Sequence, residues 1–279
     1  MTSMLLLALV NMGMGDSADL MTYNYTWLKL YDKSSCIEQR IQVPDGYRRV
    51  DSAPGSFEDW LRHLPLKDDG SRVYLFDGRM KTDQEAHHAV VNIDVGDENL
   101  LQCADVVIRL RAEYLYSHGS FDSVHFTFTN GDTAYWRNWI DGNRPIVAGG
   151  DVRWICSEAP DSSYECLREY LKTVFTYAGS YSLKGELTPV DDRFDMRIGD
   201  IFVRGGFPGH AVMVVDMAAD IESGEKLFLL MQGFMPAQDA HILKNPDDSG
   251  MSPWYRVDNS DSLFTPEWIF GYDELMRFR

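Results

Sequence analysis

The sequence predicts an α+β fold, and three observations point to it. Short apolar runs rich in β-branched residues lie at 201–203, 211–217 and 227–231, bounded by glycine, proline and charged residues as strands usually are. Two longer segments, 97–119 and 164–179, space their apolar residues as amphipathic helices do. No repeat, low-complexity run or long linker divides the chain, and 44% of its residues are hydrophobic, which is enough for one sizeable core.

The N-terminus opens with the apolar run MLLLALV at 4–10, which is too short to span a bilayer. With the small and polar residues after it, the run resembles the end of a secretory signal peptide that lacks its basic region. We therefore expect residues 1–18 to be a remnant signal peptide before a single α+β domain at 19–279, and the protein to be periplasmic or secreted. An ordinary N-terminal strand or helix is the alternative, and a cytoplasmic location is not excluded.

Three elements are expected before the first long helix. Ser56 and Asp59 belong to a capping box that opens a short helix, FEDWLRHL, which Pro65 ends. The run VYLF at 73–76 and the alternating run HAVVNIDV at 88–95 each predict a strand.

The segment 97–119 predicts a long helix with Cys103, Val107, Leu110 and Tyr114 on its buried face. Cys103 then lies in the first turn or two, where unpaired backbone N–H groups and the helix dipole lower the pKa of a thiol. This position suits a nucleophile. The alternative is a small apolar core residue, which is the commoner fate of a buried cysteine.

A hairpin is expected next, because the strand at 124–129 runs into Asn130-Gly131, a strong two-residue turn signal. Trp136 and Trp139 follow it among Asn, Asp and Arg, a mixture that suits a groove for sugar or peptide. Aromatic residues in such a pattern are as often part of the core.

The last two sheet runs, 211–217 and 227–231, should form a second hairpin. Pairing Asp216 with Lys226 gives a favourable cross-strand pair, and the same register sets His210 opposite Gln232. Directly paired residues have Cβ atoms about 5 Å apart, so the amide would hold the imidazole. A histidine held by an amide is half of a cysteine-nucleophile site. The alternative is that His210 caps a strand and Gln232 bonds the backbone.

Composition narrows the classes of partner. The formal net charge of −17, with no run of Lys or Arg, disfavours nucleic acids and anionic membranes. No later segment is long and apolar enough for a membrane helix. The four cysteines lack the spacing of a metal site, so no metal or organic cofactor is predicted, although Cys156 and Cys166 flank a loop that a disulfide could close in an oxidising compartment.

Several long motifs resemble an uncharacterised bacterial family, domain of unknown function 4846. They are LLQCADVVIRLRAEYLY, HFTFTNG, YAGSYSLKGEL, GDIFVRGGFPGHAVMVVD and MPAQDAHILKNP. The resemblance runs from about Cys36 to the end and carries no established activity.

A looser resemblance is to papain-like cysteine hydrolases, including the NlpC-type cell-wall peptidases and the CHAP amidases. It rests on GD followed by a hydrophobic strand, then GHAVMVV, then a strand that ends in Gln232. It implies a papain-like core with a Cys-bearing helix packed on an antiparallel sheet, plus an N-terminal extension, with His210 as base and Gln232 as orienter. The sequence departs from that pattern after Cys103, where Ala104 and Asp105 stand in place of Ser, Trp or Gly, and Asp105 would raise the pKa of the thiol.

These observations give the hypothesis of a cysteine hydrolase that cleaves an amide bond in peptide or cell-wall material through Cys103, His210 and Gln232. The alternative is a non-catalytic module that binds glycan or peptide through Trp136 and Trp139. Cys166 competes as nucleophile, because it also precedes a helix and lies nearer to His210 in sequence. We favour Cys103, since its helix is longer and more apolar, its register is buried, and a disulfide would consume Cys166.

Overall fold

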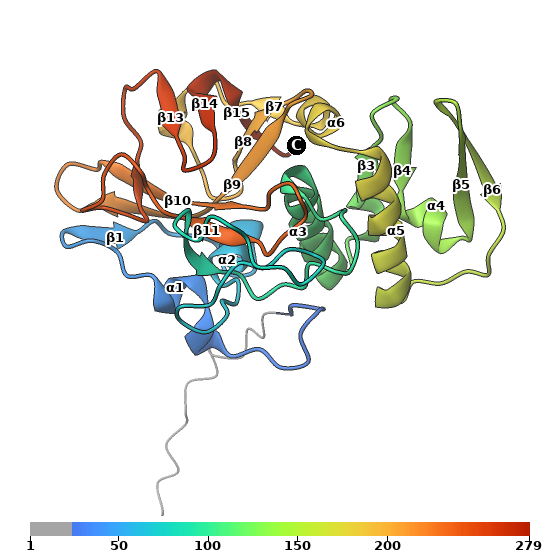
Figure 1. The fold of residues 1–279 in the computed structure, drawn as a ribbon, viewed down its shortest axis with the longest axis horizontal. Helices are drawn as coiled ribbons and strands as arrows, with labels where there is room; N and C mark the ends of the chain where they lie inside the picture. Colours follow the sequence, from blue (N-terminus) through green and yellow to red (C-terminus); the bar gives the residue numbers. More distant parts are fainter. Residues whose placement is uncertain (1–23) are drawn as a thin grey trace, which may run out of the picture.

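The structure is a computed structural model that describes residues 24–279. Helices and strands are mixed, as expected for an α+β fold, around a sheet in the order β2-β11-β10-β9-β8-β15-β7, in which all neighbouring strands are antiparallel (Figure 1). β1 also pairs with β9, and β12 with β10. The predicted signal peptide at 1–18 lies outside the described residues. No helix in the described range has the length and apolar character needed to cross a bilayer.

The helices are α1 (Ile37–Arg40), α2 (Phe57–Arg62), α3 (Cys103–Ser117), α4 (Trp136–Ile140), α5 (Tyr164–Tyr177) and α6 (Ser180–Glu186). The strands of the large sheet are β1 (Tyr47–Arg49), β2 (His87–Val90), β7 (Thr188–Pro189), β8 (Ile201–Arg204), β9 (His210–Asp220), β10 (Lys226–Gln232), β11 (His241–Leu243), β12 (Tyr255–Arg256) and β15 (Leu275–Arg277). Three separate hairpins are formed by β3 (His125–Thr127) with β4 (Thr133–Tyr135), β5 (Asn143–Ala148) with β6 (Asp151–Cys156), and β13 (Ser262–Phe264) with β14 (Ile269–Gly271).

The β9–β10 hairpin is confirmed, but its predicted register is wrong. Asp216 lies opposite Leu229, and Lys226 lies opposite Ala219. The strands continue further than predicted because the Asp220 side chain accepts hydrogen bonds from the backbone of the turn and so closes a shorter loop. A bulge between Leu229 and Leu230 then shifts the register by one residue.

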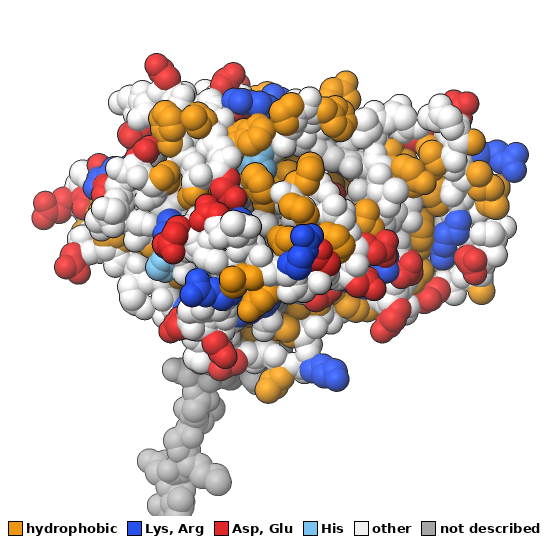
Figure 2. Space-filling model, in the orientation of Figure 1, with side chains coloured by type: hydrophobic (Ala, Val, Ile, Leu, Met, Phe, Trp, Pro, Cys, Tyr) orange, Lys and Arg blue, Asp and Glu red, His pale blue; other side chains and the backbone are white. Residues whose placement is uncertain are grey.

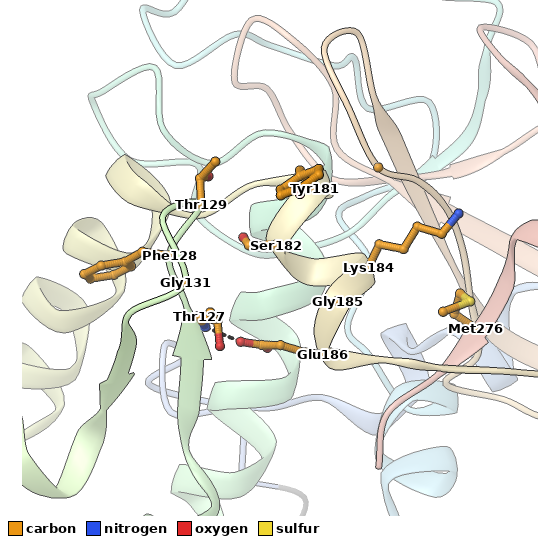
Figure 3. A pocket seen from close by; sticks show the side chains of 11 residues that line it. Thr127, Phe128, Thr129, Gly131, Tyr181, Ser182, Lys184, Gly185, Glu186 and Met276 are labelled. Atoms are coloured by element: carbon orange, nitrogen blue, oxygen red, sulfur yellow. Dashed lines mark hydrogen bonds between the residues drawn. The ribbon is translucent and has the colours of Figure 1, made fainter. Parts of the chain in front are cut away.

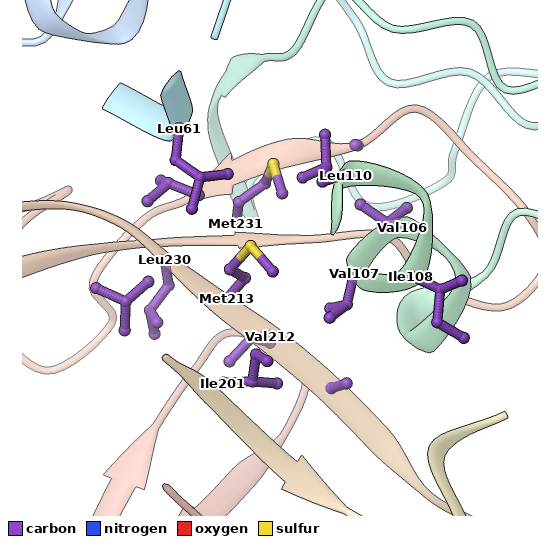
Figure 4. Packing of buried hydrophobic residues seen from close by; sticks show 14 of the residues in the cluster. Leu61, Val106, Val107, Ile108, Leu110, Ile201, Val212, Met213, Leu230 and Met231 are labelled. Carbon is purple, nitrogen blue, oxygen red and sulfur yellow. The ribbon is translucent and has the colours of Figure 1, made fainter. Parts of the chain in front are cut away.

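Helix α3 packs against β9 and forms the centre of the core. Val107 and Leu110 are buried, and Figure 4 shows them pointing from α3 toward the strands that carry Met213 and Met231. Cys103 and Tyr114, predicted on the same face, are half-buried, so the predicted buried face is confirmed in part. Each such side chain removed from water stabilises the fold by about 1.5–3 kcal/mol, so the position of α3 on the sheet is strongly determined.

Other expected elements are shorter than predicted. The run 73–76 forms isolated bridges instead of a strand, and only residues 87–90 of the next run pair in the sheet. Helix α5 ends at Tyr177, two residues before the predicted end at residue 179. The capped helix α2 and the Asn130-Gly131 turn between β3 and β4 are confirmed, since Ser56 accepts the Asp59 N–H.

Candidate active site

Cys103 is the first residue of α3 and points to the start of β9. The Gln102 backbone N–H donates to the Asp105 carboxylate at 3.0 Å, which fixes this first turn. The backbone of Ala211 makes a hydrogen bond with the thiol that lowers its pKa. The thiol therefore lies beside Ala211, the residue that follows His210, although Cys103 and His210 are far apart in the chain.

His210 and Gln232 are brought together as predicted. The His210 Nε2 atom lies 2.9 Å from the Gln232 Oε1 atom. Because of the shifted register the two residues are diagonal neighbours on one face, not directly opposite residues. A carboxamide oxygen only accepts, so Nε2 carries the ring proton and Nδ1 keeps its lone pair. Within the part of the chain that the structure describes, the hydrogen bond of the ring is made by Nε2 and none is made by Nδ1.

The imidazole of His210 is only 2% exposed and is enclosed by aromatic rings. The ring centroids of Phe234, Trp268 and Phe270 lie 5.0, 5.3 and 5.8 Å from it. This burial lowers the pKa of His210 to about 4, and the nearby Lys81 lowers it further. His210 is therefore neutral at neutral pH and able to accept a proton at Nδ1.

Two glycines, Gly209 and Gly233, lie where backbone segments approach each other closely beside His210 and Gln232. A Cβ atom on Gly233 would lie 2.6 Å from the Val106 side chain and 2.9 Å from the backbone oxygen of Gln102. A Cβ atom on Gly209 would lie 2.6 Å from the backbone oxygen of Gly206. Gly233, directly after Gln232, must therefore lack a side chain if the first turn of α3 is to pack here, and Gly209 must lack one because the backbone of the loop before β9 lies against it.

Cys103 lines a cavity of about 390 Å³. Asp105, Gly209 and Ser180 contribute to its wall, and none of its lining residues is Lys, Arg or His. Two residues of the wall are unusually exposed for apolar side chains, Phe207 at 86% and Met235 at 64%. Hydrophobic side chains gather on this face over α3, α6 and the start of β9 (Figure 2). The thiol thus opens into a cavity with an apolar rim.

The electrostatics differ from the sequence-based expectation. Burial raises the pKa of Cys103 to about 11, and the Asp105 carboxyl raises it as well, so the expected low thiol pKa is wrong. The reason is that desolvation outweighs the Ala211 hydrogen bond and the position at the start of a helix. Burial also raises the pKa of Asp105 to about 8, and its Oδ1 atom has no partner among the described residues.

A family model described as domain of unknown function 4846 (DUF4846) matches residues 37–277, a range that includes Cys103, His210 and Gln232. The chain belongs to this family. No curated protein and no solved structure matches it.

Trp136 and Trp139, the two tryptophans predicted to line a groove in this DUF4846 chain, do not form a surface groove. Trp136 is 0% exposed and Trp139 is 3% exposed, and both rings pack on Tyr170 of α5 with centroids 5.5 Å apart. Neither ring lines the Cys103 cavity. Their placement is that of core residues, so a ligand could not stack on them without opening this part of the fold.

The rival cysteine of the DUF4846 chain lies in different surroundings. Cys166 is buried, and its contacts are Arg144, whose guanidinium lies 3.9 Å from the sulfur, and Trp139. Cys156 is exposed, and all four cysteines are free thiols in the structure. Of Cys103 and Cys166, Cys103 is the one that contacts the strand carrying His210.

Three residues that the sequence did not single out surround Gln232. Its Nε2 atom lies 2.6 Å from Glu267 Oε2 and 3.2 Å from His241 Nε2. Lys81 in turn lies 2.6 Å from the same Glu267 oxygen. Lys81 and Glu267 are distant in the chain from Gln232 and belong to none of the motifs above, and although His241 lies within MPAQDAHILKNP, that motif does not indicate a contact with Gln232. Among the described residues, no group of three His, Cys, Asp or Glu could hold a metal ion.

A larger cavity of about 490 Å³ lies elsewhere, between the β3–β4 hairpin and α6 (Figure 3). Thr127 and Phe128 approach it from the hairpin, and Tyr181 and Ser182 from the helix. Glu186 accepts a hydrogen bond from the Thr127 backbone and is thereby engaged in structure. This cavity has no thiol in its lining, so the smaller cavity at Cys103 is the better candidate for nucleophilic chemistry.

Proposed function

We propose that the protein is a cysteine hydrolase with a papain-like core, exported from a bacterial cell and acting on an amide bond in peptide or cell-wall material. One observation carries the proposal. A half-buried thiol at the first residue of α3 is hydrogen-bonded by the backbone of Ala211, the residue after His210, a neutral histidine whose Nε2 lies 2.9 Å from the Gln232 amide oxygen and whose Nδ1 has no partner among the described residues. Nucleophile, base and orienter are the three parts that such catalysis needs.

The reaction would begin from a neutral thiol and a neutral imidazole. His210 Nδ1 takes the thiol proton while Cys103 Sγ attacks the carbonyl carbon, and the unpaired N–H groups of the first turn of α3 stabilise the oxyanion. The C–N bond then breaks, and the imidazolium returns its proton to the leaving amine. In the second half, His210 takes a proton from water, the hydroxide attacks the acyl-enzyme, and the thiol is regenerated with that proton.

The high pKa of Cys103 determines the protonation state from which the proposed reaction starts. A thiol with a pKa of about 11 is protonated at neutral pH, so no resting thiolate–imidazolium pair is formed. Proton transfer must therefore accompany attack, as it does when a serine is the nucleophile. A substrate that expels water from the cavity and places its carbonyl against α3 would supply the stabilisation of charge that the free protein lacks.

The second candidate function is a non-catalytic module that binds peptide or glycan in the Cys103 cavity. Two observations favour it: the raised pKa of the thiol, and the exposed Phe207 and Met235 in the wall of the cavity. Exposed apolar side chains around a concave site are typical of ligand binding. In this version the binding surface is the cavity and its rim, not the buried tryptophans.

The test compares the wild-type protein with Cys103→Ala and, as a matched control, Cys156→Ala, which removes an exposed thiol outside the site. Each protein is incubated with cell-wall fragments and a peptide library, and newly released amines are measured by mass spectrometry. We expect release by the wild type and the control and none by Cys103→Ala. Binding without release by all three would establish the module, and release that persists in Cys103→Ala would exclude Cys103 as nucleophile.

A further inference from the structure

The side-chain amide of Gln232 can be flipped so that its oxygen and its NH₂ group exchange places with little change in shape. The two orientations place the ring proton of His210 on different nitrogens. With Oε1 toward the ring, Nε2 of His210 is a donor and Nδ1 is free to accept the thiol proton. With the NH₂ group toward the ring, Nε2 would have to accept and Nδ1 would carry the proton. His210 therefore has an Nδ1 atom able to accept a proton in only one of the two amide orientations.

Two acceptors on the far side of Gln232 select that orientation. Glu267 Oε2 lies 2.6 Å from Gln232 Nε2, a short, charge-assisted contact. His241 Nε2 lies 3.2 Å from the same nitrogen, and its Nδ1 lies 2.8 Å from the backbone oxygen of Asp239. Because that oxygen only accepts, His241 Nδ1 carries the proton and His241 Nε2 must be an acceptor. A flipped amide would direct its oxygen at two acceptors.

Glu267 is itself held in place. Lys81 Nζ contacts the same oxygen, Oε2, at 2.6 Å, and the two side chains are 9% and 14% exposed. Lys81 also lies 5.5 Å from the ring of Phe234, which packs on His210. Burial keeps His241 neutral, since it lowers the pKa of that ring to about 3. His241 is therefore an acceptor across the neutral range, and the contact with Lys81 fixes the position of Glu267.

We propose that Glu267 is a positioning residue for His210, acting through Gln232, with His241 as the second acceptor and Lys81 as the anchor of Glu267. The catalytic part of this role rests on the proposed function, because it assumes that His210 Nδ1 accepts the Cys103 proton. The structural part does not, because the chain from Lys81 to His210 determines the tautomer of His210 whatever the cavity does.

The experiment reads the tautomer directly. Heteronuclear NMR of the ring nitrogens distinguishes a proton on Nε2 from one on Nδ1, and a His210→Gln variant assigns the signal of His210 among the seven histidines. We expect the wild type to carry the proton on Nε2. In Glu267→Leu the carboxylate acceptor is lost, and we expect His210 to populate the Nδ1–H tautomer, with the rate of Cys103 alkylation or of hydrolysis falling about tenfold or more at an unchanged KM.

Glu267→Gln is the conservative variant. Both Lys81 and Gln232 contact one oxygen of Glu267, so a carboxamide oxygen at the same place can accept from both. We expect Glu267→Gln to keep the Nε2–H tautomer and most of the reactivity. Asp200→Asn is the matched control, because Asp200 is a buried carboxylate paired with Arg277 at 2.6 Å and takes no part in this chain.

Loss of Glu267 leaves Lys81 as a buried unpaired cation, so Glu267→Leu alone could fail to fold. The double variant Lys81→Met with Glu267→Leu removes both charges. It leaves no unpaired charge, so the tautomer of His210 can be measured in a folded protein that lacks Glu267. An unchanged His210 tautomer in the folded double variant would overturn the proposal. If the tautomer changes while no variant shows Cys103-dependent hydrolysis, the positioning role stands and the hydrolase function fails.

Discussion

Cys103 and Cys166 each lie in the first turn of a long amphipathic helix, yet the two helix starts pack against different elements. Cys103 begins α3, which packs on β9, and the Ala211 backbone bonds its thiol. Cys166 is the third residue of α5, where its backbone N–H donates to the capping hydroxyl of Ser163 at 3.2 Å. The start of a helix is therefore insufficient for a site, and what decides is the element against which that start packs.

The two thiols also differ in the charges around them. Burial raises the pKa of both, but Arg144 lowers that of Cys166, whereas Asp105 raises that of Cys103. By charge alone Cys166 has the more favourable surroundings. The backbone contact favours Cys103, because Ala211, the residue after His210, bonds its thiol, whereas the contacts of Cys166 are Arg144 and Trp139. The contact with β9 thus favours Cys103, and the neighbouring charges favour Cys166. Experiments can decide between the two cysteines.

The largest effect should follow from separating α3 from the strands. Gly233→Ala places a Cβ atom 2.6 Å from Val106 and 2.9 Å from the backbone oxygen of Gln102, which cannot move without the helix. We expect the free energy of unfolding, measured in urea, to fall by about 2 kcal/mol or more. Cys103 should become more readily alkylated as α3 moves away, while Cys166 is unchanged.

Gly185→Ala is the matched control. It lies in α6 with nothing within 4 Å of an added Cβ atom, and alanine is the better helix former by about 0.5–1 kcal/mol. This variant should be as stable as the wild type or more so. If Gly233→Ala is no less stable than Gly185→Ala, the close approach of α3 to β10 is not required by the fold.

The sequence predicted the elements that form the site better than it predicted their register. Long apolar periodicity made α3 and the central strands recognisable, and the contact of His210 with Gln232 followed because the strand pattern put both on one face. The register was wrong because the turn length depends on hydrogen bonds of the Asp220 side chain, and the bulge leaves no pattern in the sequence.

Other features of the site were beyond sequence reasoning for physical reasons. An aromatic residue among polar neighbours has the same pattern in a groove and in a core, so the burial of Trp136 and Trp139 could not be read from composition. The pKa of Cys103 depends on how tightly the strands enclose it, which no local motif encodes. Glu267 reaches Gln232 only through the folded chain.

A smaller effect is expected from Asp105→Asn, which tests how the charge next to Cys103 affects the reactivity of its thiol. The ionised Asp105 raises the pKa of Cys103, so its removal should lower that pKa and speed alkylation of Cys103. The gain should be up to about tenfold, which corresponds to one pKa unit. It should be greatest above about pH 8, where Asp105 is ionised in the wild type. Asp161→Asn, which removes a carboxylate near Cys166, is the control and should leave the rate at Cys103 unchanged.

The same variant tests stability against pH. The pKa of Asp105 is about 8 in the folded protein and about 4 in an unfolded chain. Because the folded state holds the proton more tightly, Asp105 favours folding below about pH 4, and this contribution is lost as the pH rises toward 8. Asp105→Asn should therefore flatten the fall in stability over this window in urea unfolding curves. Curves that stay parallel to the wild type at every pH would mean that the carboxyl is not desolvated.

The smallest effect should come from Cys166→Ala. The change removes one buried sulfur next to Arg144 and Trp139, with an expected loss of about 1 kcal/mol or less in the free energy of unfolding. Since Cys166 does not contact β9, the pH profile of Cys103 alkylation, followed by peptide mapping, should match that of the wild type. A reactive thiol that disappears in Cys166→Ala but survives in Cys103→Ala would reverse the assignment. It would show that the guanidinium beside Cys166 matters more for reactivity than the contact of Cys103 with β9.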